Sequence, residues 1–330
     1  RGREAIRNTR WSFGFQQEIG RDMTVEVNYV GQRGADMPLS SGLGDDSREL
    51  NALPLQYYSL GARLQDPVPN PFAGLINIGA HSSPTIARRQ LLLPYPQFTS
   101  VNLQRQTDGA SDYHSLQISS MRRFSAGLMA QFTYTWSKLI EELRFIDPAN
   151  PSPSRMIGEF DNPHRVTFAG IWELPFGRGR RFGSGSGVAD KVIGGWQLNA
   201  TYIYQTGAAV PLGTAALATG VSPGIEGRTI DNWFNRQSLA LLPAFTPRTL
   251  PYYWAGLRQH NMNNWDVSFL KNTTLWRERL RLQFRCELIN AFNRTWFANP
   301  DVNPGSGNYA RVAGQANQPR IIQMGLKLQF

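Results

Sequence analysis

The residue types that carry catalysis and metal binding occur in this chain, but their spacing fits neither activity. His81, His114, His164 and His260 are dispersed, and they show neither the H-E-x-x-H pattern nor another paired-ligand spacing. The segment Gly183-Ser184-Gly185-Ser186-Gly187 has serine at its second and fourth places. A nucleophile elbow instead has a central serine that follows a strand. We therefore predict no catalytic residue, no metal site and no bound cofactor, and we expect the protein not to be an enzyme.

Three further features could do chemistry, and each favours an ordinary role. Cys286 is the only cysteine, which excludes an internal disulfide and a cysteine zinc cluster. It lies on the apolar side of a predicted strand and is interpreted as a small packing residue. The pair Glu141-Glu142 could act as acid and base, but adjacent carboxylates in a loop are usually solvated. The segment 177–187 is rich in glycine and arginine but lacks the G-x-G-x-x-G and P-loop patterns, so we predict a flexible basic turn.

The clearest periodic segment is the last ten residues, 321–330. Apolar side chains occupy every second position, with polar or small residues between them: Ile322, Met324, Leu326, Leu328 and Phe330. A period of two predicts a β-strand with one apolar and one polar face. Soluble domains more often fray at their termini, whereas this pattern runs to the terminal carboxylate and ends on an aromatic ring.

Similar alternation predicts eight further strands. They are expected at about 11–19, 23–29, 116–121, 128–137, 166–174, 196–205, 265–275 and 280–288. A break of parity before Met121 suggests a bulge in the third strand. Gln17 and Lys271 fall on the apolar side, and the lysine is tolerable there only near a membrane interface. With the closing strand, the pattern predicts about nine antiparallel strands and an all-β fold.

The predicted strands are joined alternately by short turns and long loops. The short turns lie near Arg21, Ala126, Gly185 and Arg277, and together they occupy one rim of the sheet. The proline-rich stretch 31–111 is predicted as a long loop, in which 101–105 forms either a strand extension or a small hairpin. Long loops on one rim and short turns on the other are typical of outer-membrane barrels, with the long loops outside the cell and the short turns in the periplasm.

Composition is compatible with a membrane-spanning sheet. No run of about 18 apolar residues is present, so no membrane-spanning helix is predicted. Spanning strands expose only alternate residues to lipid, so a chain that is 41% hydrophobic can still cross a membrane. The net charge of +10 could indicate a nucleic-acid binder. However, most Lys and Arg are scattered at polar strand positions or near turns, and we therefore predict no nucleic-acid partner.

Periodicity alone does not separate a membrane barrel from a soluble two-layer sandwich, because both have one apolar and one polar face. The aromatic content, the loop asymmetry and the terminal strand favour the barrel. Arg281, Arg285 and Glu287 all avoid the apolar side, and we expect them to pair across the lumen. Because unpaired strand edges are unstable in lipid, nine strands imply further strands upstream. We expect residues 1–330 to be the C-terminal part of a large transmembrane β-barrel.

Several short motifs resemble the C-terminal barrel of TonB-dependent receptors, specifically the Oar-like branch. They are Tyr113–Gln117, Arg122–Ser125, Phe132–Lys138, Asp161–Arg165, Leu174–Gly177, Gly195–Gln197, Asn264–Asp266, Asn290–Asn293 and the closing Phe330. The resemblance implies an N-terminal plug, absent from this chain, and uptake of a bulky ligand driven through the TonB complex. It also implies that the barrel-assembly machinery reads the terminal residues Met324, Leu326, Leu328 and Phe330. The expected surroundings are outer-membrane lipid and lipopolysaccharide.

The resulting prediction is an outer-membrane TonB-dependent transporter or receptor whose ligand the sequence does not identify. Two alternatives remain open. A passive porin- or adhesin-type barrel would lack a plug upstream, so the sequence of the parent gene distinguishes it. A soluble, basic all-β binding module would dissolve without detergent and bind nucleic acid in a salt-dependent way.

Overall fold

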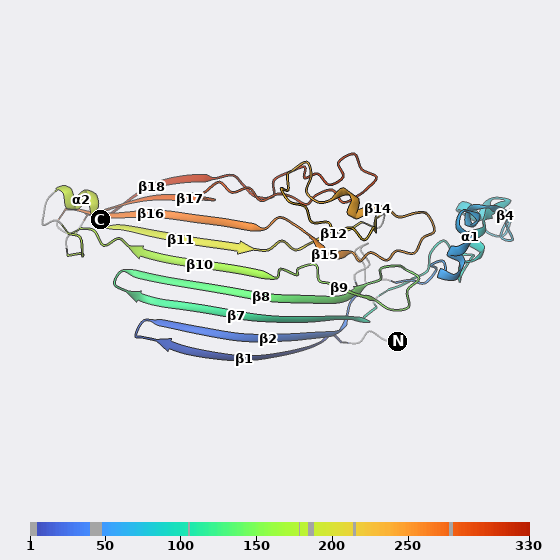
Figure 1. The fold of residues 1–330 in the computed structure, drawn as a ribbon, viewed down its shortest axis with the longest axis horizontal. Coiled ribbons are helices and arrows are strands. Elements are labelled where there is room, and N and C mark those ends of the chain that lie inside the picture. Colours follow the sequence, from blue (N-terminus) through green and yellow to red (C-terminus); the bar gives the residue numbers. More distant parts are fainter. Residues whose placement is uncertain are drawn as a thin grey trace.

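The computed structural model describes residues 5–39, 48–104, 106–177, 179–183, 188–213, 216–276 and 280–330. One large antiparallel sheet contains nine strands in chain order, each paired with the next (Figure 1). They are β1 (Arg7–Ile19), β2 (Met23–Met37), β7 (Gly109–Ser125), β8 (Leu128–Arg144), β10 (His164–Glu173), β11 (Trp196–Gln205), β16 (Met262–Trp276), β17 (Leu280–Ile289) and β18 (Ile321–Gln329). A short strand, β9 (Ser154–Ile157), also pairs with β8. The predicted all-β fold and its nine strands are confirmed.

The short connections lie at one end of the sheet, as predicted. Gly20 begins the β1–β2 turn with a φ of 67°, a conformation that glycine adopts without strain. Ala126 and Gly127 join β7 to β8, both at positive φ. The ladder shifts register between Arg122 and Ser125, so β7 has a bulge, although it lies nearer the turn than the parity break indicated. The turns predicted near Gly185 and Arg277 lie outside the described residues.

The two faces of the sheet differ in chemistry. On one face Phe132, Phe168, Tyr202 and Trp265 are successive register partners across four strands, and the rings of Tyr202 and Trp265 stack with centroids 4.5 Å apart. The opposite face is polar, with Asn199, Thr201, Asp266, Ser268 and Glu287 grouped on β11, β16 and β17. The alternation of apolar and polar residues in the sequence therefore corresponds to the two faces of the sheet.

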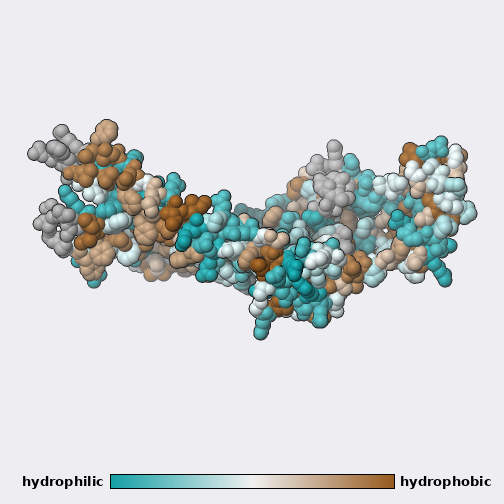
Figure 2. Space-filling model, turned by 90° about the horizontal axis from the view of Figure 1, so that it is seen from above, coloured by the Kyte–Doolittle hydropathy of each residue, from teal (hydrophilic) through white to brown (hydrophobic). Residues whose placement is uncertain are grey.

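The apolar face is uncovered. Phe13 is 78% exposed and Leu326 is 73% exposed, although each lies within the sheet. A soluble sandwich would bury these side chains against a second sheet, and no second layer packs here among the described residues. Figure 2 shows apolar residues gathered over the end that carries the sheet and mainly hydrophilic residues over the loop end.

The buried apolar core lies in the long loops instead of against the sheet. Its largest cluster includes Leu212, Trp233, Phe234, Leu257 and Val312. Where the structure describes them, the loops contain short elements: β3 (Arg48–Glu49), η1 (Leu55–Gln65), β4 (Pro67–Pro69), η2 (Gly79–Ser82), β5 (Thr85–Ala87), α1 (Arg88–Leu91), β6 (Asn102–Leu103), β12 (Ala209–Pro211), β13 (Ala216–Ala218), η3 (Arg236–Ser238), β14 (Leu239–Leu241) and β15 (Tyr253–Arg258). The loop end is therefore a packed structure with a core of its own. At the opposite end of the sheet lies α2 (Val188–Ile193) (Figure 1).

Some sequence interpretations are corrected. The pair Glu141-Glu142 lies in β8, not in a loop, because β8 continues to Arg144. Arg285 and Glu287 form an ion pair along one strand, at 3.5 Å, rather than across a lumen. The strand extension or small hairpin expected at 101–105 is the two-residue β6, which pairs with β3. In the part of the chain that the structure describes, every helix is too short or too polar to cross a membrane.

Candidate functional site

Lys271 is a charged side chain on the apolar face, at a place where such a charge is tolerable. Its Nζ donates a hydrogen bond of 2.6 Å to the carbonyl oxygen of Gly194. The ammonium group also lies 5.0 Å from the centroid of the Trp196 ring, a cation–π contact. Trp196 begins β11 at the end of the sheet that carries the short turns. The charge of Lys271 therefore lies at the edge of the apolar face, where the sequence analysis expected it to be tolerable.

At the opposite end, a break in the β8 ladder positions a buried carboxylate. β9 and β10 pair with β8 one after the other, and residues 158–163 bulge out between them. The amide of Leu139 lies opposite this bulge, where it would have no backbone acceptor. The Asp161 carboxylate accepts its hydrogen bond at 2.8 Å instead. Since buried amides are seldom left unpaired, Asp161 completes the ladder across the bulge.

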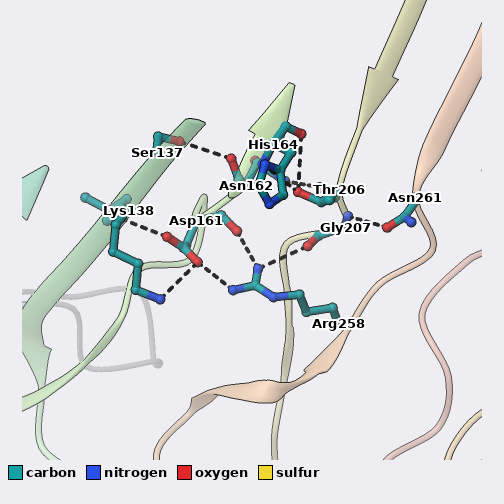
Figure 3. Close-up of polar contacts among 10 residues, drawn as sticks. Ser137, Lys138, Asp161, Asn162, His164, Thr206, Gly207, Arg258 and Asn261 are labelled. Atoms are coloured by element: carbon teal, nitrogen blue, oxygen red, sulfur yellow. Dashed lines mark hydrogen bonds and ion pairs between the residues drawn. The ribbon is translucent and has the colours of Figure 1, made fainter. Parts of the chain in front are cut away.

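Two cations neutralise this carboxylate (Figure 3). Arg258 at the end of β15 approaches Asp161 Oδ2 to 2.6 Å, and Lys138 Nζ lies 3.6 Å from the same oxygen. The Asp161 side chain is 0% exposed. Arg258 also donates to the carbonyl oxygens of Asp161 at 2.8 Å and Gly207 at 3.2 Å. We call Lys138, Asp161 and Arg258 the Asp161 clamp, because it joins β8, the bulge at 158–163 and the end of β15.

The residues next to Asp161 extend the same junction. The Asn162 amide nitrogen donates to the carbonyl oxygen of Thr206 at 2.8 Å, and the backbone amide of His164 donates to the Thr206 hydroxyl at 3.0 Å. The His164 ring Nδ1 is 2.9 Å from the Tyr134 hydroxyl. His164 therefore orders the loop end through Tyr134 and Thr206. Figure 3 shows the junction: Lys138 comes from β8, His164 from β10, Thr206 from the start of the β11–β12 loop and Arg258 from β15.

A pocket of about 300 Å³ opens beside the clamp. Gln205 and Met262, which are partners in the β11–β16 register, form its base on the polar face of the sheet. The walls come from the bulge and from two loops, and include Phe160, Asn162, Gln259, Trp296 and Asn299. We call this the amide pocket, after its four Asn and Gln side chains. It lies where the polar face of the sheet meets the loop end.

The titratable groups of the amide pocket carry little free charge. Burial, and then a hydrogen bond to the Glu159 carboxylate, raises the pKa of Tyr253 to about 12, so this phenol keeps its proton. Glu159 is itself 3.6 Å from Arg144. Burial lowers the pKa of His260 below its ordinary value, so the imidazole is neutral near pH 7. Its Nδ1 is buried and has no hydrogen-bond partner among the described residues.

The histidines considered in the sequence occupy separate places. His81 is buried, with its Nε2 2.9 Å from the Pro96 carbonyl oxygen, and His114 contacts the Tyr29 hydroxyl at 2.7 Å. Within the described residues no three His, Cys, Asp or Glu side chains are grouped to hold a metal ion. Ser184 and Ser186 lie outside the described residues. Cys286 faces the apolar side, as predicted, opposite Phe269 and Met324.

The terminal residues singled out from the sequence lie on the last strand. Met324, Leu326 and Leu328 project from β18 on its apolar face, paired in register with Cys286, Phe284 and Leu282. All three are exposed, and Phe330 follows the end of the strand at the turn end, fully exposed. β18 has no second neighbouring strand among the described residues. Its apolar side chains and its free edge are both accessible.

An antiparallel sheet with one uncovered apolar face, one polar face and packed loops at a single end is part of the wall of a membrane-spanning β-barrel. The chain belongs to the outer membrane beta barrel domain family, whose model matches residues 4–323. The protein is accordingly located in the cell outer membrane, where its apolar face contacts lipid. The polar face is the lumen face, and the long loops are extracellular.

Among curated proteins, no sequence matches this chain. Several solved structures resemble it at low identity, among them the following three. The outer membrane transporter YddB from Escherichia coli is 10% identical with a TM-score of 0.49, over 99% of this chain and 33% of that one. FpvA of P. aeruginosa, solved with bound pyoverdines, is 10% identical with a TM-score of 0.40, over 98% and 27%. The Pseudomonas putida toluene transporter TodX is 8% identical with a TM-score of 0.27, over 98% and 61%. The chain thus spans about a third of the length of YddB.

Sequence reasoning missed most of the loop-end site. The segment Asp161–Arg165, which includes Asn162, was noticed as a motif, but Arg258, Gln259 and Asn299 were not singled out. The Asp161–Arg258 contact joins residues 97 positions apart, and no periodic pattern connects them. The one available signal was the Asp161-Asn162-Pro163 sequence in a loop, which suggests a structured turn without indicating its partner.

Proposed function

We propose that the chain is the C-terminal barrel portion of a TonB-dependent transporter that takes up a bulky ligand. The motif set read from the sequence supports the family branch. The observation that carries a transport role is the amide pocket, which opens onto the lumen face at the extracellular end. A ligand held there would already stand at the mouth of the barrel. Strands that pair with the free edges of β1 and β18 would close the barrel, and a plug upstream would fill it.

The proposal is tested on the full-length protein encoded by the parent gene. We expect a plug and a TonB-binding segment upstream of residue 1, and co-purification with the periplasmic domain of TonB from the same cells. In planar bilayers a plugged barrel should remain closed. A passive porin, the alternative, would give stepwise ion conductance and would not retain TonB. Stepwise conductance without TonB binding would overturn the proposal.

We also propose that the exposed side chains of β18 are recognised by the barrel-assembly machinery. Deleting Phe330 should sharply reduce the folded barrel in the outer membrane, because the terminal ring is fully exposed and available to a receptor. The heat-modifiable band on cold gels measures the folded fraction. The matched variant Gln329→Ala changes the neighbouring polar residue and should leave the folded yield near that of the parent. If both variants gave the same yield of folded barrel, Phe330 would not be part of the signal that the assembly machinery recognises.

A further inference from the structure

We propose that the amide pocket binds a neutral, polyhydroxylated ligand, namely part of an oligosaccharide chain. This inference rests on the proposed transport function and names its substrate class. It follows from three independent features of the pocket: its unpaired amides, its aromatic rings and its lack of cationic groups.

The first feature is a set of amide side chains without partners. Gln205, Gln259 and Asn299 all line the pocket, and none of the three side chains has a hydrogen-bond partner among the described residues. A primary amide both donates and accepts hydrogen bonds. The natural complement is a group that does the same, and a sugar hydroxyl is such a group. Several amides aimed into one pocket therefore match several hydroxyls on one ligand.

The second feature is aromatic surface at the same place. Phe160 is 75% exposed, and its backbone is anchored because Asp161 beside it is held in the clamp. Trp296 is held by a hydrogen bond of 3.2 Å from its Nε1 to the His260 carbonyl oxygen. Rigid aromatic rings offer a large apolar surface at a low entropy cost. The C–H faces of sugar rings provide apolar surface that can lie against them.

The third feature is the charge of the pocket. No Lys or Arg is among its described lining residues, and His260 is neutral near pH 7. The one lining carboxylate, Glu159, is already engaged by Arg144 and Tyr253. An anionic ligand, such as a phosphate ester or a carboxylate-bearing metal chelate, would find no cation there. A neutral ligand carries no charge that must be desolvated when it enters the pocket.

The size of the pocket limits what it holds. Its volume of about 300 Å³ is at the lower end of the usual range for small-molecule sites, about 300–1,000 Å³. A bulky ligand would therefore place only a short stretch of its chain here and would extend into the lumen. The pocket is then a recognition site for one segment of a longer saccharide.

The test uses the full-length protein in detergent, titrated by calorimetry with maltotriose, cellotriose, xylotriose and the anionic trigalacturonate. We expect at least one neutral trisaccharide to bind and trigalacturonate not to. The double variant Gln205→Met/Gln259→Met removes two amides with little change in shape, and it should weaken binding at least tenfold. Gln131→Met, at an exposed amide on the same lumen face but outside the pocket, is the matched control and should bind like the parent.

The inference is overturned if no neutral trisaccharide binds, if trigalacturonate binds more tightly, or if the double variant binds as well as Gln131→Met. The heat-modifiable gel band confirms that each variant is folded. Failure of the transport function gives a different result, in which the trisaccharide binds to the purified protein but cells with functional TonB do not accumulate it. Conversely, if the protein retains TonB but binds no saccharide, the transport proposal stands and the oligosaccharide proposal is wrong.

Discussion

Replacing Asp161 by alanine is expected to destabilise the loop end of the barrel by about 3–5 kcal/mol, the usual effect of breaking a buried ion pair by removing one partner. The Asp161 side chain is fully buried, and its loss leaves Arg258 without its carboxylate and the Leu139 amide without an acceptor. Thermal unfolding of the full-length protein in detergent, with limited proteolysis of the extracellular loops, measures the effect. Cleavage within 158–163 and 206–208 should appear at a lower temperature than in the parent.

Two further variants separate the contributions. Asp161→Asn keeps an oxygen for the Leu139 amide but removes the charge, so it should be destabilised less than Asp161→Ala. Glu142→Ala removes a carboxylate from an exposed ion pair with Arg155, and such pairs are worth only about 0–1 kcal/mol. It is the control for loss of a carboxylate from the same region. If Asp161→Ala proved as stable as Glu142→Ala, the clamp would not hold the loops.

The strands could be predicted because their determinant is local. In β11 every second residue from Trp196 to Tyr204 is apolar, and a period of two specifies a sheet face without knowledge of the partner strand. The predicted strands were nevertheless too short at the loop end. β8 continues past Ser137 to Arg144, where Lys138 and Glu142 stand at positions of the apolar parity and break the pattern. Beyond the membrane no lipid selects alternate apolar residues, so the periodic signal ends before the strand does.

The loop-end site could not be predicted because its determinants are distant in the chain. The Asp161 clamp joins the end of β8, the bulge and β15, and the amide pocket adds Trp296 from the loop before β18. Each of these residues is unremarkable in its own segment. Their roles depend on register: Gln205 faces the pocket because its partner in β16 is Met262, and a shift of one residue would turn it toward lipid. The sequence therefore predicted the wall of the barrel but not the amide pocket that we propose as its binding surface.

Introducing arginine at Val267 is expected to destabilise the barrel by about 2–4 kcal/mol, the effect of a basic side chain on the lipid face near the bilayer midplane. Val267 lies on the apolar face of β16, in register with Ala200 on β11 and Leu288 on β17. The guanidinium would have no acidic partner in hydrocarbon. Urea unfolding of the full-length protein in lipid vesicles, followed by tryptophan fluorescence, measures the loss.

The neighbouring substitution Ser268→Arg provides the matched control. Ser268 lies on the opposite face of the same strand, directly beside Asn199 and Glu287 in the register. An arginine there would stand in the lumen near a carboxylate, so the barrel should keep a stability close to that of the parent. The two variants share the strand, the depth and the introduced charge, and they differ only in which face carries it. Equal destabilisation of both would mean that the apolar face does not contact lipid, and a much larger effect of Ser268→Arg would place lipid on the opposite side of the sheet.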